Sequence, residues 1–144
     1  MLTALLYGAE TWPMTKANMK KLEAAHHRWQ RRILGVTWKD KMKNEDVRKR
    51  TSMEKLEEML KKMRLRWLGH IHRASEERIM KQALDWTPAG WKRRRGRPRK
   101  TWRSTIMQDL EDGGMTWEEA ETAVEDRVTW RGCVARCATS AWKD

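Results

Sequence analysis

Apolar residues recur at intervals of three and four along most of the chain, and this spacing predicts α-helices. In the first such stretch, one helical face is formed by Met19, Leu22, His26, Trp29 and Ile33. Thr15 is placed to cap the start of this helix, and Gly35 is placed to end it in a left-handed conformation. After a basic loop, Asn44 is predicted to cap a short helix and Ser52 to cap the next one.

The clearest periodicity lies in the helix predicted after Ser52, whose apolar face consists of Leu56, Leu60, Met63, Trp67 and Ile71. Its other face carries the cations Lys61, Lys62, Arg64 and Arg66. Ser75 is placed to cap a further short helix that ends near Trp86. Leu2–Tyr7 is the one segment whose short apolar run also suits a strand.

The C-terminal part of the chain shows the same helical spacing. Trp102, Ile106 and Leu110 form a stripe that Gly113 and Gly114 end. Thr116 and Glu119 then have the spacing of a capping box, and the last helix is predicted to break near Asp126. Trp29, Trp67, Trp102 and Trp130 fall on or near these stripes, so core packing is expected for them. The predicted fold is all-α, a small and loosely packed helical domain.

An extended basic linker is predicted between the helical parts. Residues 87–90, Thr-Pro-Ala-Gly, mark a turn. The run that follows, residues 91–100, is unsuited to a helix because its like charges repel and because it contains Gly96 and Pro98. We therefore expect a helical region at 1–86, an extended linker at 87–101, and a helical region with an acidic surface at 102–144.

The charge is unevenly distributed along the chain, and its distribution indicates a class of binding partner. The net charge is +12. Residues 20–52 hold eleven basic and four acidic residues, and residues 86–108 hold eight basic residues and no acidic one. Residues 109–144 hold four basic and nine acidic residues. Two basic blocks of this kind predict a polyanionic partner, although a merely solvated surface suits residues 20–85 equally well.

Several classes of protein are excluded by the same arithmetic. No apolar run approaches the ~20 residues that a membrane-spanning helix needs, and the first residues do not resemble a signal peptide. The chain contains two cysteines, too few for a disulfide framework. A nuclear or cytoplasmic location is expected, and the basic run favours the nucleus.

Six blocks of the sequence resemble, in the same order, the region that follows the polymerase palm in non-LTR (LINE-type) retrotransposon reverse transcriptases. The blocks cover residues 5–12, 31–40, 65–73, 94–102, 117–120 and 126–131. The resemblance implies the thumb of such a polymerase and the basic linker behind it, where helices grip the template–primer duplex. The catalytic core of that family carries an Asp-Asp pair that holds Mg²⁺, and this sequence has no such pair. We therefore expect a non-catalytic fragment.

Nucleic acid is the expected partner, as duplex, RNA/DNA hybrid or single strand. The predicted contacts are Lys92, Arg93, Arg94, Arg95, Gly96, Arg97, Pro98, Arg99, Lys100, Arg28, Arg31, Arg32, Lys61, Arg64 and Arg66. The sequence from Arg95 to Pro98 also resembles an AT-hook, which would lie in the minor groove of A·T-rich DNA. The same segment suits phosphate tracking, nuclear import, or a plain flexible linker. Trp38, Trp86 and Trp91 flank basic loops and are candidates for base stacking.

Cofactors, metal sites and catalytic groups find little support. Cys133 and Cys137 are the weak metal candidates, because their spacing does not match a zinc knuckle, and no cofactor or small-molecule substrate is predicted. Two other interpretations remain open at this point. One is a protein-interaction module, whose Trp-rich face docks on a partner or on a second copy. The other is a non-functional relic of a retroelement.

Overall fold

The computed structural model describes residues 2–86, 89–90, 92, 95–96 and 99–139. Its helices are α1 (Leu2–Leu5), η1 (Ala9–Thr11), α2 (Lys16–Leu34), η2 (Trp38–Asp40), α3 (Asn44–Thr51), α4 (Leu56–His72), α5 (Ile79–Asp85), α6 (Trp102–Asp112), α7 (Trp117–Glu125) and α8 (Arg127–Thr139). The described ranges contain no strand, which confirms the all-α prediction. The candidate strand at Leu2–Tyr7 is wrong because this short apolar run forms α1.

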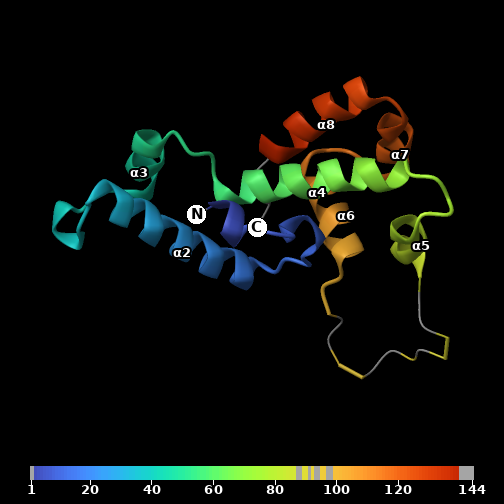
Figure 1. The fold of residues 1–144 in the computed structure, drawn as a ribbon, viewed down its shortest axis with the longest axis horizontal. Helices are drawn as coiled ribbons and strands as arrows, with labels where there is room; N and C mark the ends of the chain where they lie inside the picture. Colours follow the sequence, from blue (N-terminus) through green and yellow to red (C-terminus); the bar gives the residue numbers. More distant parts are fainter. Residues whose placement is uncertain (1, 87–88, 91, 93–94, 97–98, 140–144) are drawn as a thin grey trace.

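The helix α4 crosses the centre of the molecule and organises the fold (Figure 1). Helices α6, α7 and α8 pack around its C-terminal half, while α2 and η1 pack near its N-terminal half. Helix α3 packs against α2 at the far side from α7 (Figure 1). Helix α4 belongs to the predicted region 1–86, and it packs against all three helices of the predicted region 102–144.

Two apolar clusters form the core, and both include residues of α4. The first joins Leu65 and Leu68 of α4 to α6, α7 and α8, including Trp130. The second joins Leu56 and Leu60 to the N-terminal segment and the start of α2. The clusters lie toward opposite ends of α4, so the middle of this helix lies between them.

Glycine at position 69 sets how closely α8 approaches α4. A methyl group on Gly69 would overlap the indole of Trp130. Trp130 is buried, and its Nε1–H donates to the carbonyl oxygen of Leu65 at 3.0 Å. The absence of a side chain at Gly69 thus lets an indole ring pack directly on the α4 backbone.

Most of the predicted helix boundaries are confirmed by capping geometry. Thr15 accepts a hydrogen bond from the Asn18 backbone N–H at 3.2 Å, and Gly35 ends α2 with a φ of 65°. The capping box of Thr116 and Glu119 is present. Asp126 separates α7 from α8, as predicted.

The prediction for Ser52 was wrong. Ser52 has a φ of 52° and ends α3 instead of capping α4, which follows Lys55. Asn44 is the first residue of α3, one position after its cap. Ser75 is likewise not the cap, since Arg78 immediately precedes α5.

The buried face of α2 is rotated from the predicted one. Ile33 is 68% exposed, whereas His26, His27 and Gln30 are buried with Met19. The part of this face that holds His27 and Gln30 packs against α3, where Gln30 donates to Thr51 at 3.2 Å. The interface between α2 and α3 is polar, so the spacing of apolar residues does not predict it.

No helix among the described residues has the length and apolarity needed to cross a membrane.

Candidate nucleic-acid interface

Two of the predicted nucleic-acid contacts are buried and cannot serve as such. Lys61 and Arg64 are both fully buried, although the apolar spacing of α4 placed them on its outer face. Arg64 donates to the Asp109 carboxylate of α6 through Nε at 2.7 Å and Nη2 at 2.9 Å. Lys61 lies 3.4 Å from the carboxylate of Asp112. These cations hold α4 against α6 between the two apolar clusters.

The cations that do reach the surface of α4 line a groove between α4 and α8. The groove has a volume of about 640 Å³. Its lining residues are Lys62, Arg66, His70, Arg73, Arg127, Trp130, Arg131, Val134 and Ala135. Five of them are Lys or Arg, and no carboxylate lines the groove within the described part of the chain. Such a concentration of positive charge between two helices favours a polyanion.

Only part of this charge is engaged by the protein itself. Lys62 binds the Glu54 carboxylate at 2.7 Å, and Arg73 donates to the carbonyl oxygen of Val124 at 2.8 Å. The side chains of Arg66, Arg127 and Arg131 make no hydrogen bond or ion pair with any described residue. These three guanidinium groups are therefore available to phosphate oxygens, which they can bind in bidentate geometry.

The start of α8 fixes the position of the two α8 arginines that line the groove, Arg127 and Arg131. The Asp126 carboxylate accepts hydrogen bonds from the backbone N–H of Thr129 at 2.8 Å and from its hydroxyl at 2.6 Å. These hydrogen bonds lower the pKa of Asp126. Arg127 lies in the first turn, where the helix dipole disfavours a cation. Arg127 therefore gains nothing from the helix dipole, and its side chain lies in the groove.

Comparison with known proteins gives one informative match. Over 148 aligned positions the chain is 27% identical to an uncharacterized transposon-derived protein of Caenorhabditis elegans, with 98% of this chain and 53% of that protein covered. The chain is distantly related to a transposon-derived protein. It spans about half the length of this curated relative. No protein-family model matches the chain, and no solved structure matches it.

Sequence reasoning missed most of the groove. Of its arginines and lysines, only Arg66 was among the predicted contacts. A signal for the others was present in the spacing, because Lys62, Arg66 and His70 recur every four residues, as do Arg127 and Arg131. The link between the two rows is tertiary, since 54 residues separate Arg73 from Arg127.

The three predicted contacts on α2 have different fates. Arg28 and Arg32 are exposed. Arg31 is half-buried and donates to the Met42 carbonyl oxygen at 3.0 Å and to Asn44 Oδ1 at 2.7 Å. Arg31 therefore braces the loop between α2 and α3, whereas its two neighbours remain accessible.

The linker is described in part. Lys92, Arg95, Gly96 and Arg99 are exposed and form neither helix nor strand. Lys100 is half-buried and, with Arg99, lines a hollow of about 1210 Å³ between α2 and α6 whose other lining residues include Glu111 and Asp112. The predicted contacts Arg93, Arg94, Arg97 and Pro98 lie outside the described residues.

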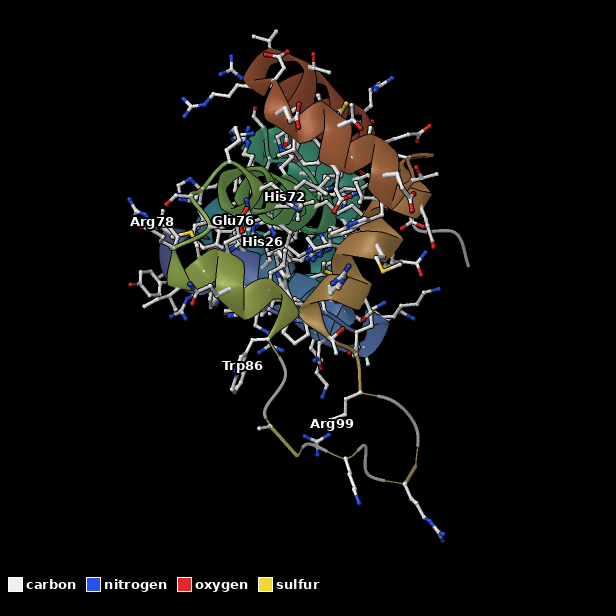
Figure 2. All side chains as sticks on the ribbon, turned by 90° about the vertical axis from the view of Figure 1, so that its right-hand side faces the viewer. His26, His72, Glu76, Arg78, Trp86 and Arg99 are labelled. Atoms are coloured by element: carbon white, nitrogen blue, oxygen red, sulfur yellow. The ribbon has the colours of Figure 1, made fainter. Side chains whose placement is uncertain are left out.

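The aromatic candidates are exposed where they are described. Trp38 is 83% and Trp86 is 69% exposed, and Figure 2 shows Trp86 and Arg99 projecting away from the packed helices. Trp91 lies outside the described residues. Trp130 is buried as predicted, while Trp29, Trp67 and Trp102 are half-buried.

The two cysteines belong to the core. Cys133 and Cys137 are buried in the apolar cluster around Trp130, and burial raises the pKa of the Cys137 thiol. Among the described residues, no group of three or more His, Cys, Asp or Glu side chains is placed to hold a metal ion.

Proposed function

We propose that this chain is a nucleic-acid-binding part of a retrotransposon reverse transcriptase, equivalent to its thumb and the basic linker that follows. The family resemblance of the six sequence blocks supports the origin, and the relation to a transposon-derived protein agrees with it. In this proposal the chain grips nucleic acid and performs no chemistry of its own.

The α4–α8 groove is the observation that carries the proposal. It offers five cations without an opposing carboxylate in its described lining, and three of its arginines make no ion pair within the described chain. Phosphate contacts of this kind supply most of the sequence-independent affinity of nucleic-acid-binding proteins. The linker would add to this affinity through Lys92, Arg95, Arg99 and the basic residues between them, and it would also suit nuclear import.

Salt dependence tests the proposal directly. Binding of a labelled B-DNA duplex, an RNA–DNA hybrid and a single strand would be followed by fluorescence anisotropy over a series of salt concentrations. Each phosphate contact contributes about −0.9 to the slope of log K against log salt on B-DNA, so three groove arginines predict a slope of about −2.7 from the groove alone. An affinity that does not change with salt would refute the proposal.

A matched pair of variants on one helix separates the groove from general surface charge. Arg131→Ala removes a groove cation, whereas Arg136→Ala removes an exposed cation of α8 that does not line the groove. The first variant should reduce the slope by about 0.9, and the second should leave it nearly unchanged. Equal losses in the two variants would show that binding is not localised to the groove.

A further inference from the structure

An aromatic pair lies at the edge of the cationic groove. The rings of Trp67 and His70 on α4 are stacked, with centroids 5.2 Å apart and planes inclined by 25°. Trp67 is half-buried, while His70 is exposed and lines the groove. The inner face of the His70 ring is therefore supported by the indole, and its outer face is open to solvent.

Cations flank this open aromatic face along the same helix. Arg66 precedes His70 by four residues and Arg73 follows it by three, and all three side chains line the groove. Residues at these spacings occupy one side of a helix. A flat aromatic surface is thus placed between two guanidinium groups, of which that of Arg66 is unpaired within the described chain.

This combination is the one that single-stranded nucleic acid requires. Proteins that bind single strands combine a positively charged groove, which follows the backbone, with aromatic rings on which bases stack. Within an intact duplex each internal base pair is already stacked on both faces and cannot stack on His70, whereas an unpaired base can.

We propose that the Trp67–His70 pair receives an unpaired base, so that the α4–α8 groove prefers a single strand or a single-stranded extension over blunt duplex. This inference rests on the proposed function, because it assumes that the groove binds phosphate. Trp67 acts as the support of the platform, and His70 makes the contact with the base.

The test compares a blunt duplex with the same duplex carrying a single-stranded extension, using the full chain. The extension contains 2-aminopurine, whose fluorescence is quenched when the base stacks. We expect about tenfold tighter binding of the extended duplex, the value of one modest stacking contact, together with quenching. DNA and RNA extensions are tested separately.

Three substitutions of one exposed residue separate stacking from charge and from folding. His70→Phe keeps an aromatic face and should keep both the preference and the quenching. His70→Ala and His70→Gln remove the ring and should abolish both, so that the extended duplex binds no more tightly than the blunt duplex. A fold defect would instead lower the affinity for both ligands, and circular dichroism would detect it.

The possible outcomes discriminate between the inference and the function on which it rests. Salt-dependent binding of both ligands with equal affinity, or a preference that His70→Ala leaves intact, overturns the aromatic platform and leaves nucleic-acid binding in place. Failure to bind either ligand overturns both proposals. A preference lost in His70→Ala and His70→Gln and kept in His70→Phe supports the platform.

Discussion

Removal of the Asp109 carboxylate is expected to destabilise the fold severely. Arg64 and Asp109 are both fully buried and are joined by two hydrogen bonds of 2.7 and 2.9 Å. In Asp109→Ala, the Arg64 guanidinium stays buried and charged, because arginine does not release its proton in proteins. Breaking a buried pair from one side costs about 3–5 kcal/mol, a large share of a typical unfolding free energy of about 5–15 kcal/mol.

The opposite substitution should cost less, and the structure gives the reason. Burial raises the pKa of the Asp109 carboxyl, while the hydrogen bonds from Arg64 act in the other direction. When Arg64→Met removes the partner, Asp109 can become neutral by binding a proton, whereas Arg64 cannot become neutral in Asp109→Ala. Arg64→Met should therefore lose less stability than Asp109→Ala, and its loss should shrink as the pH is lowered.

Replacement of both partners separates the interaction energy of the ion pair from the cost of burying its charges. The double variant Arg64→Met with Asp109→Leu leaves no buried charge at this position, and such replacements are often neutral or stabilising by about 1–4 kcal/mol. Urea unfolding followed by far-ultraviolet circular dichroism measures these three variants and Asp109→Leu alone. The coupling energy follows from the cycle formed by Arg64→Met, Asp109→Leu and the double variant. A loss below about 1 kcal/mol in Asp109→Ala, or no coupling between the positions, would refute the reasoning.

Three further predictions concern other parts of the molecule. Gly69→Ala should cost about 1–3 kcal/mol, measured by urea unfolding, because its methyl group overlaps the indole packed on α4. Burial, Arg48 and Arg31 lower the pKa of His27 from 6.5, so the folded state favours neutral His27. The free energy of unfolding should therefore be highest above pH ~6.5 and should fall as the pH drops through the folded pKa. His27→Gln should flatten this part of the profile of unfolding free energy against pH. Arg95→Ala combined with Arg97→Ala should weaken binding in the anisotropy assay, more for A·T-rich than for G·C-rich duplex if the segment reads the minor groove.

The helices and their ends could be predicted because they depend on local chemistry. Thr15, Gly35 and the Thr116–Glu119 box act through hydrogen bonds or backbone conformations within a few residues of themselves. Ser52 was misassigned because its residue type suits a helix start, whereas its left-handed conformation, uncommon for a residue other than glycine, is imposed by the α3–α4 connection.

The sequence predicts the positive charge of the candidate site but not where the groove lies. Net charge and the basic linker pointed to a polyanion, yet α4 is covered on several sides, so charged residues of the helix lie inside as well as outside. The partners of Lys61 and Arg64 are Asp112 and Asp109, 51 and 45 residues further along the chain. The sequence does not distinguish a buried cation from an exposed one when the carboxylate that pairs with the buried cation is so far along the chain.

The connection between α5 and α6 begins and ends at positions that the helical body fixes. Lys81 of α5 donates to the carbonyl oxygen of His72 at 3.2 Å, and Trp102 at the start of α6 donates to the carbonyl oxygen of Glu10 at 2.7 Å. With both ends held, the entropy of closing the loop grows only with the logarithm of its length, about 0.6 kcal/mol for each doubling. Insertions and deletions between residues 86 and 101 are therefore nearly neutral for folding. Arginines can therefore be added to or removed from the basic segment while the helices keep their arrangement.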